Sequence, residues 1–297
     1  MKRIVLVSAA FAIVFAACSL AASPAPSPAG TSGLEPTAVP VASPSPGPGD
    51  ELVLEIVEGG GLVPDHVPLV QLPAVAVYAD GSMITQGPMI EIYPGPALPN
   101  LQLTRLSADA LGHIVALVRQ AGLAGPDRTL NVQGIADASS TIFTTDLGGA
   151  RHRTVAVALG SEADVSVQAE DLAARAALVA LQQHLVDLRS APGAVVGEDR
   201  PYEWTALRIV VSSDLPEPDP AVRPGPIAWP LEPGLAAFGE PVGASMRCGV
   251  LAGEELARVR PAIEQANDLT RWVSGDAEYR LYLRPLLPHE SGCEPAY

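Results

Sequence analysis

The chain of 297 residues carries 33 acidic side chains against 18 lysines and arginines, a formal charge of −15 that disfavours nucleic acids and anionic membrane surfaces as partners. Apolar residues make up 48% of the chain, enough for a folded core, but aromatic residues make up only 4%. Aliphatic side chains must therefore fill most of that core, and the length allows one large or two modest folded units.

The first 17 residues have the pattern of a secretory signal peptide. A positively charged start, MKR, precedes an apolar run from Ile4 to Ala17 that is interrupted only by Ser8. This run is too short to span a bilayer, which requires about 20 apolar residues. It matches the apolar region of a signal peptide, and the small residues before Cys18 supply a cleavage site.

Phe15-Ala16-Ala17-Cys18 resembles the lipobox of bacterial lipoproteins, in which an apolar and two small residues precede an invariant cysteine. Phe15 departs from the leucine usual at its position. The resemblance implies a diacylglyceryl group on the Cys18 thiol and cleavage before it, and the body looks like uncharacterised lipoproteins of high-GC bacteria. Two acyl chains suffice for stable membrane attachment. The alternative is an ordinary cleaved signal peptide with Cys18 as a bystander.

Residues 18–50 form the predicted tether. Eight prolines are interleaved with Ala, Ser, Gly and Thr, with almost no charge and no amphipathic period. Such a segment cannot bury enough apolar surface to offset its ordering entropy, so we expect disorder with a polyproline II bias. It would hold an extracytoplasmic body away from the membrane, although an unselected leader would look the same.

Cys248 and Cys293 are the remaining cysteines if Cys18 is acylated. In an oxidising compartment a disulfide between them is the natural inference. It would close a loop of about 45 residues, which corresponds to roughly 4 kcal/mol from loop closure. A metal-binding or redox pair would need a CxxC spacing or a nearby histidine cluster, and the sequence has neither.

Hairpins are the main β signal. They are predicted at residues 75–84, 141–159 and 271–286, after a first strand at 52–57. Asp80-Gly81 between apolar flanks predicts a two-residue turn that pairs Val77 with Ile84. In the third hairpin, alternating apolar and charged residues predict one buried face and one wet face that includes Arg284.

Three segments have helical periodicity. The first begins at a Ser107 cap and ends at Gly122, and the others span residues 170–189 and 254–267. Pro261 should kink or split the third. Hairpins with two to three packed helices predict an α+β fold with antiparallel sheets.

The order of elements predicts two similar halves. A strand, a proline-rich crossing, a helix and a hairpin follow one another twice, which suggests a degenerate duplication. The predicted organisation is given by five segments: 1–17 signal peptide, 18–50 lipidated cysteine and tether, 51–190 first half, 191–203 linker or seam, and 204–297 second half with the disulfide.

Weak binding signals are confined to a basic cluster (Arg151, His152 and Arg153) and to Trp229. The cluster could bind an anion or could be a solvated strand start, and Trp229 could be a glycan or peptide platform or a core residue. No HExxH, GxSxG or histidine-rich motif is present, so the sequence supports no catalytic residue, metal or cofactor.

These observations favour a lipid-anchored extracytoplasmic protein that binds an unknown ligand, with an envelope protein or glycan as partner and no nucleic acid. The alternatives are a cell-envelope hydrolase of sugar or peptide that uses a carboxylate pair, and an inhibitor of a secreted enzyme. A deep pocket with two facing acids would favour the hydrolase. A surface that exposes Trp229 or the basic cluster would favour a binding protein.

Overall fold

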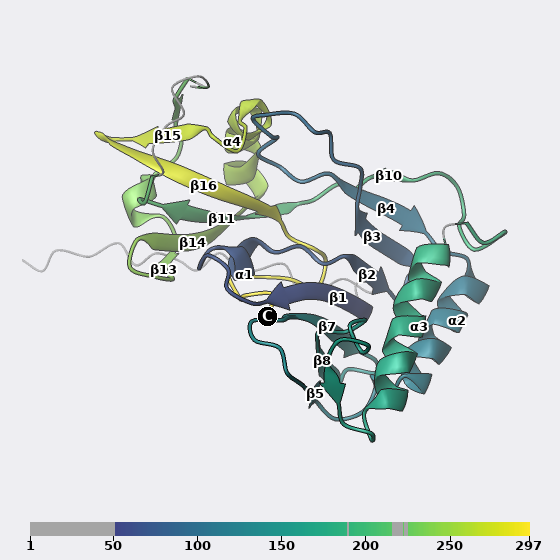
Figure 1. Ribbon diagram of the computed structural model, residues 1–297. Coiled ribbons are helices and arrows are strands. Elements are labelled where there is room, and N and C mark those ends of the chain that lie inside the picture. Colours follow the sequence, from purple (N-terminus) through teal and green to yellow (C-terminus); the bar gives the residue numbers. More distant parts are fainter. Residues whose placement is uncertain (1–50, 189, 216–221, 223–224) are drawn as a thin grey trace, which may run out of the picture. The chain divides into compact units, whose positions relative to one another are not determined.

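The computed structural model describes residues 51–188, 190–215, 222 and 225–297 (Figure 1). The predicted signal peptide, Cys18 and the tether all lie outside these residues. Two large, mainly antiparallel sheets and four α-helices form within them, which confirms the α+β prediction with more sheet than helix. None of the described helices has the length and apolar character needed to cross a membrane.

The first large sheet has eight strands in the order β10-β4-β3-β2-β1-β7-β8-β5, antiparallel except for the pair of β5 and β8. Its strands are β1 (Leu52–Gly60), β2 (Val75–Tyr78), β3 (Ser82–Gln86), β4 (Leu101–Arg105), β5 (Arg128–Leu130), β7 (Ser139–Asp146), β8 (Arg151–Val157) and β10 (Arg200–Pro201). A separate two-stranded sheet pairs β6 (Val132–Gln133) with β9 (Ser166–Val167).

The hairpin of β2 and β3 forms where Asp80-Gly81 predicts it, but the predicted register is wrong by one residue. Val77 pairs with Met83. The loop between β2 and β3 has three residues. Within it, Gly81 takes a φ of +83°, and the Asp80 carboxylate accepts a 2.8 Å hydrogen bond from the backbone N–H of Ser82. A three-residue loop that ends in a left-handed residue is the next most common hairpin connection.

Two helices, α2 (Ala108–Gln120) and α3 (Leu172–Leu188), cover one face of the eight-stranded sheet (Figure 1). Ser107 caps α2 as predicted, because its side chain accepts a hydrogen bond from the backbone N–H of Ala110 at 3.2 Å. The predicted apolar stripes are buried against the sheet, where they include Ile114, Val118, Leu178, Leu181, Leu185 and Leu188. Removal of these side chains from water is the main favourable term for this layer.

The second large sheet has six strands in the order β12-β15-β16-β11-β14-β13, antiparallel except for β12 and β15. Its strands are β11 (Ala206–Ser212), β12 (Ile227–Ala228), β13 (Glu240–Pro241), β14 (Met246–Ala252), β15 (Arg271–Ser274) and β16 (Ala277–Pro285). A short 3₁₀ helix, η1, spans Leu235–Ala237.

Helix α4 (Gly253–Gln265) packs on one face of the six-stranded sheet. Pro261 lies inside it without splitting it, which corrects that part of the prediction. The core below contains Leu207, Ile209 and Val211, the alternate residues of β11, so the intervening residues of this strand face the other way.

The described chain also contains α1 (Val67–Val70) and a C-terminal segment, defined here as residues 286–297. This segment contacts both large sheets on the faces that the helices leave uncovered. Leu287 packs with Tyr78 and Ile84 of the eight-stranded sheet, whereas Cys293 packs with Val210 of the six-stranded sheet.

The predicted disulfide joins Cys248 of β14 to Cys293 of the C-terminal segment, with their Cα atoms 6.0 Å apart. Further contacts fix the same segment. The backbone N–H of Ala296 donates to the Pro68 carbonyl at 2.8 Å, and the Tyr297 ring lies against Gly59 of β1, where a Cβ would find no room. The segment is therefore an integral layer of the fold.

The boundary predicted at residues 191–203 contributes to the eight-stranded sheet. Arg200–Pro201 forms β10 and pairs with Gln102–Leu103 of β4, and Val195 forms a bridge with Leu106. The remaining strands of the eight-stranded sheet precede this segment, and the six-stranded sheet follows it. The proposed duplication stays a prediction.

Candidate functional site

A cavity of about 570 Å³ lies between residues of the eight-stranded sheet, β11 and the C-terminal segment. The side chains that line it are mostly polar or charged, and none is tyrosine, tryptophan or phenylalanine. They belong to Glu55, Asp127, Thr144, Arg151, His152, Arg153, Arg208, His289, Glu290, Ser291, Glu294, Pro295 and Ala296.

Glu55 enters the cavity from the middle of β1. It pairs with Thr144 of β7, and Thr144 pairs with Arg153 of β8, so the three lie in one row across the sheet. Leu54 and Ile56 on either side belong to the core under the helices, so Glu55 occupies the opposite face because successive strand residues alternate. Its exposed fraction is only 9%, which is low for a carboxylate.

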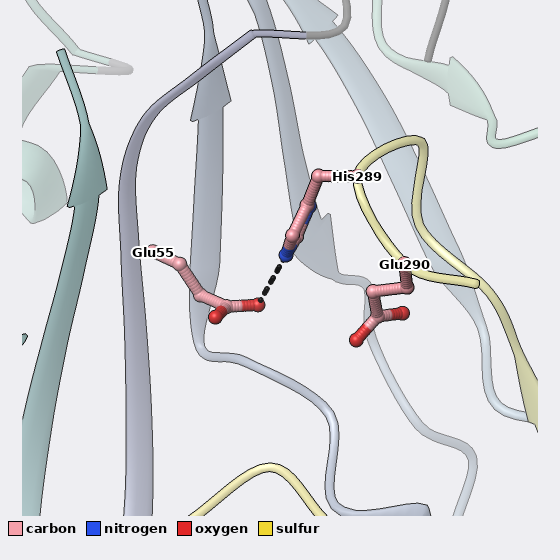
Figure 2. A group of neighbouring side chains, drawn as sticks. All are labelled: Glu55, His289 and Glu290. Atoms are coloured by element: carbon pink, nitrogen blue, oxygen red, sulfur yellow. Dashed lines mark ion pairs between the residues drawn. The ribbon is translucent and has the colours of Figure 1, made fainter. Parts of the chain in front are cut away.

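His289 lies between Glu55 and Tyr78. Its Nε2 is 3.3 Å from Glu55 Oε1, and its Nδ1 is 2.9 Å from Tyr78 Oη (Figure 2 shows the imidazole and the Glu55 carboxylate facing each other). Tyr78 is buried in β2, and the C-terminal segment supplies His289. The tyrosine hydroxyl therefore fixes the ring so that Nε2 points toward the carboxylate.

Glu290, the next residue, forms the strongest ion pair of the site. Arg284 of β16 donates from Nη1 to Oε2 at 2.6 Å and from Nη2 to Oε1 at 2.5 Å, and the backbone N–H of Leu287 donates to Oε2 at 2.8 Å. Burial alone would raise the pKa of the Glu290 carboxyl, but the charge and hydrogen bonds of Arg284 outweigh burial and hold that pKa below its ordinary value. Glu290 is thus a fixed anion.

Arg208 is a second buried arginine, opposite Arg284 on the neighbouring strand. Its Nε donates to the Gly292 carbonyl at 2.6 Å and its Nη1 to the Leu69 carbonyl at 2.8 Å. Burial, followed by the charge of Arg284, lowers its pKa to about 10, so it remains charged at neutral pH. Its Nη2 has no hydrogen-bond partner among the described residues.

The structure separates the two binding signals found in the sequence. Arg151, His152 and Arg153 begin β8 and line the cavity, with both arginines exposed. Trp229 is only 8% exposed and packs edge-on against Phe238 and against Trp272 in the core of the six-stranded sheet. Trp229 is therefore a core residue in this structure and offers no exposed platform.

The sequence analysis did not indicate the acidic residues of the cavity or His289. Glu55 could have been noticed, because it is the one charge within the apolar strand LVLEIV. Arg284 was assigned to the wet face of its hairpin, and this assignment is wrong, since the residue is 1% exposed. The signal that explains Arg284 is Glu290, which follows the strand and folds back onto it.

The described residues contain one group of histidine and carboxylate side chains close enough to hold a metal ion, namely Glu55, His289 and Glu290. One donor atom from each lies within 4.8 Å of the others (Figure 2). These atoms come from β1 and from the C-terminal segment, which meet only in the folded chain.

No protein-family model, curated protein or solved structure matches this chain. The cavity must therefore be interpreted from its own residues. Two of its acids are engaged, because Asp127 accepts from the backbone N–H of Arg153 at 2.7 Å and Glu290 is held by Arg284. Arg151, Arg153 and Arg208 line the same cavity and form no ion pair among the described residues, so their guanidinium groups are available to an anionic group of a ligand.

Proposed function

We propose that the protein is a lipid-anchored extracytoplasmic binding protein, and that the cavity binds a small polar ligand with a carboxylate or phosphate group. The observation that carries this proposal is the convergence of Arg208 and the basic cluster (Arg151, His152 and Arg153) on one cavity. Arginine presents planar donors that match both anionic groups.

The cavity favours a polar ligand of limited size. A volume of about 570 Å³ falls within the usual range for small-molecule sites. The absence of tyrosine, tryptophan and phenylalanine from its lining disfavours a ligand recognised by stacking on aromatic rings. Arg208 supports an anionic group, since a buried guanidinium with only carbonyl partners keeps a full positive charge that a bound anion would neutralise.

The proposed location depends on two features of different kinds. The lipobox-like sequence at Cys18 provides the anchor, and the Cys248–Cys293 disulfide is compatible with an oxidising compartment outside the cytoplasm. The charge balance also supports a lipid anchor over a basic membrane-binding face, because the loss of Lys2 and Arg3 with the signal peptide would change the net charge from −15 to −17.

The hydrolase alternative is less well supported, although the cavity does contain two acids, Glu55 and Glu290. A carboxylate pair that cleaves a glycosidic bond needs one member with a raised pKa to act as the general acid. Glu290 is shifted in the opposite direction by Arg284. Glu290 is therefore unsuited to be the proton donor at neutral pH, and binding without catalysis is the better account.

The ligand test is a thermal-shift screen of the full chain against small carboxylates and phosphates, followed by calorimetry of each hit. We expect Arg153→Ala to weaken binding about tenfold or more, the loss associated with a charged hydrogen bond. Arg258→Ala on the exposed face of α4 is the matched control and should bind normally. Equal binding by both variants would contradict an anion site at this cavity.

The anchor is tested separately. Cys18→Ser should move the protein from the membrane fraction to the soluble extracytoplasmic fraction, because the acylated thiol is its only proposed attachment. Intact-mass measurement of the native protein should show a mature chain that begins at lipidated Cys18. Retention of the variant on membranes would require a different anchor.

A further inference from the structure

We propose that Glu55, His289 and Glu290 bind a divalent transition-metal ion of the zinc type, with its open coordination positions directed into the cavity. The ion is a component of the protein that the sequence motifs did not indicate. Its binding is separate from that of the proposed anionic ligand and can be measured with the metal alone.

The spacing of the donor atoms fits a shared ion. Zinc binds imidazole nitrogen at about 2.0 Å and carboxylate oxygen at about 2.1 Å in tetrahedral geometry, which places two such ligand atoms about 3.4 Å apart. His289 Nε2 and Glu55 Oε1 are 3.3 Å apart, longer than a typical N–H to oxygen hydrogen bond. All three donors lie within 4.8 Å of one another, so a small side-chain movement completes the set.

Each donor retains a lone pair for the ion. Glu55 Oε2 has no hydrogen-bond partner among the described residues. Glu290 Oε1 accepts a hydrogen bond from Arg284 alone, and a carboxylate oxygen can accept two. The Tyr78 hydroxyl lies at Nδ1 of His289. When Nδ1 carries the ring proton and donates a hydrogen bond to the tyrosine oxygen, Nε2 keeps a lone pair that can bind the ion.

The second layer of contacts has the arrangement found around protein metal ions. A metal-binding histidine usually has its other ring nitrogen in a hydrogen bond, and metal-binding carboxylates are themselves hydrogen-bonded. Tyr78 meets the first condition at 2.9 Å, and Arg284 meets the second through two contacts to Glu290. Both partners are buried, so they hold the ligands in place before an ion arrives.

The ligand types favour a transition metal over calcium or magnesium. Arg284 offsets the charge of Glu290, and Arg208 lies at the same cavity, so electrostatic attraction is reduced for every divalent cation and the chemistry of the ligands decides between them. Calcium and magnesium require several oxygen ligands, whereas the imidazole of His289 supplies a nitrogen that zinc prefers. Selectivity at this site therefore comes from the histidine.

The test uses the full chain with its disulfide intact, stripped with a chelator and then titrated with Zn²⁺ against a coloured competitor. Elemental analysis should find one zinc per chain. Glu55→Gln and His289→Ala should weaken affinity about tenfold or more, and Tyr78→Phe about 10- to 100-fold. Glu58→Gln, on the same strand, and His113→Ala, exposed on α2, are the matched controls and should bind as the unaltered chain does.

Circular dichroism and thermal unfolding establish that each variant folds. If His289→Ala does not fold, the near-isosteric Glu55→Gln and Tyr78→Phe decide the question. Zinc binding well below one per chain would overturn the proposal, and so would zinc affinity that is unchanged in folded Glu55→Gln. An equal response to Ca²⁺ or Mg²⁺ would overturn the assignment to a transition metal.

Discussion

The two faces of the eight-stranded sheet are stabilised by different kinds of contact. The face under α2 and α3 is an apolar layer in which Ile114 and Phe143 are completely buried. The opposite face carries Glu55 and Tyr78, and the C-terminal segment covers it with His289. The first face is held by contacts that need only the right volume and polarity, and the second by specific pairs of polar atoms.

This difference indicates where stability and function reside. An apolar layer tolerates substitutions that keep its volume, because its attraction is non-directional. A buried polar layer fails when one partner is removed, because the other partner is left unsatisfied. Substitutions on the two faces should therefore differ in kind as well as in size.

The largest expected effect comes from the disulfide that holds the polar layer. The double variant Cys248→Ser/Cys293→Ser opens a loop with a sequence separation of 45 residues and should lose roughly 4 kcal/mol of unfolding free energy. Urea unfolding measures the loss. Hydrogen exchange should show that amides of the C-terminal segment lose more protection than those of α2 and α3, and a uniform loss would contradict the separation of the two faces.

The second test removes the charge of Glu290. Glu290→Gln leaves Arg284 buried without its counter-ion and should cost about 3 kcal/mol, as for other broken buried ion pairs. The apolar replacement Arg284→Met/Glu290→Leu should recover most of this loss. Glu162→Gln is the comparison, because its partner Arg175 retains three backbone carbonyl acceptors and should tolerate the change better.

Acid should distinguish two glutamates, Glu290 and Glu58, whose pKa values are shifted in opposite directions. The pKa of Glu290 lies below its ordinary value of 4.5, so its stabilisation is present above pH 4.5 and is lost as pH falls through the lowered pKa. Burial raises the pKa of Glu58, beside α3, so its contribution declines as pH rises from 4.5 through the raised pKa. Unfolding of Glu290→Gln and Glu58→Gln between about pH 3 and 6 should remove slopes of opposite sign.

The smallest effect is expected under the helices. Ile114→Val removes one methylene from the apolar layer and should cost about 1 kcal/mol. Ligand and zinc binding should not change, because Ile114 belongs to the core on the face opposite the cavity. A reduction in either affinity would show that the two faces are coupled.

The sequence predicts local features of this fold well. The Ser107 cap, the stripe of Leu178, Leu181 and Leu185, and the Cys248–Cys293 pair were all expected, because each depends on neighbours along the helix or on the shortage of other partners. The register of the first hairpin was not, since Asp80-Gly81 suits both two- and three-residue loops.

The site depends on contacts that no local pattern contains. Glu55 and His289 are far apart in the sequence. They meet in space only because the C-terminal segment packs against both large sheets. Alternation along β16 assigns Arg284 to the water-facing side, because periodicity cannot show that a later segment will cover that side. Of the cavity residues, the sequence indicates only the basic cluster of Arg151, His152 and Arg153.

The crosslink between β14 and the C-terminal segment has a consequence for how the protein matures. Two of the three proposed metal ligands, His289 and Glu290, lie in the C-terminal segment that the disulfide attaches to β14. The binding site should therefore be completed late, when the thiols are oxidised. A cell deprived of its thiol-oxidising machinery should then accumulate chains that have helices and hairpins but retain no zinc. The redox state of the compartment would thereby decide whether the protein binds zinc, even where most of its secondary structure has formed.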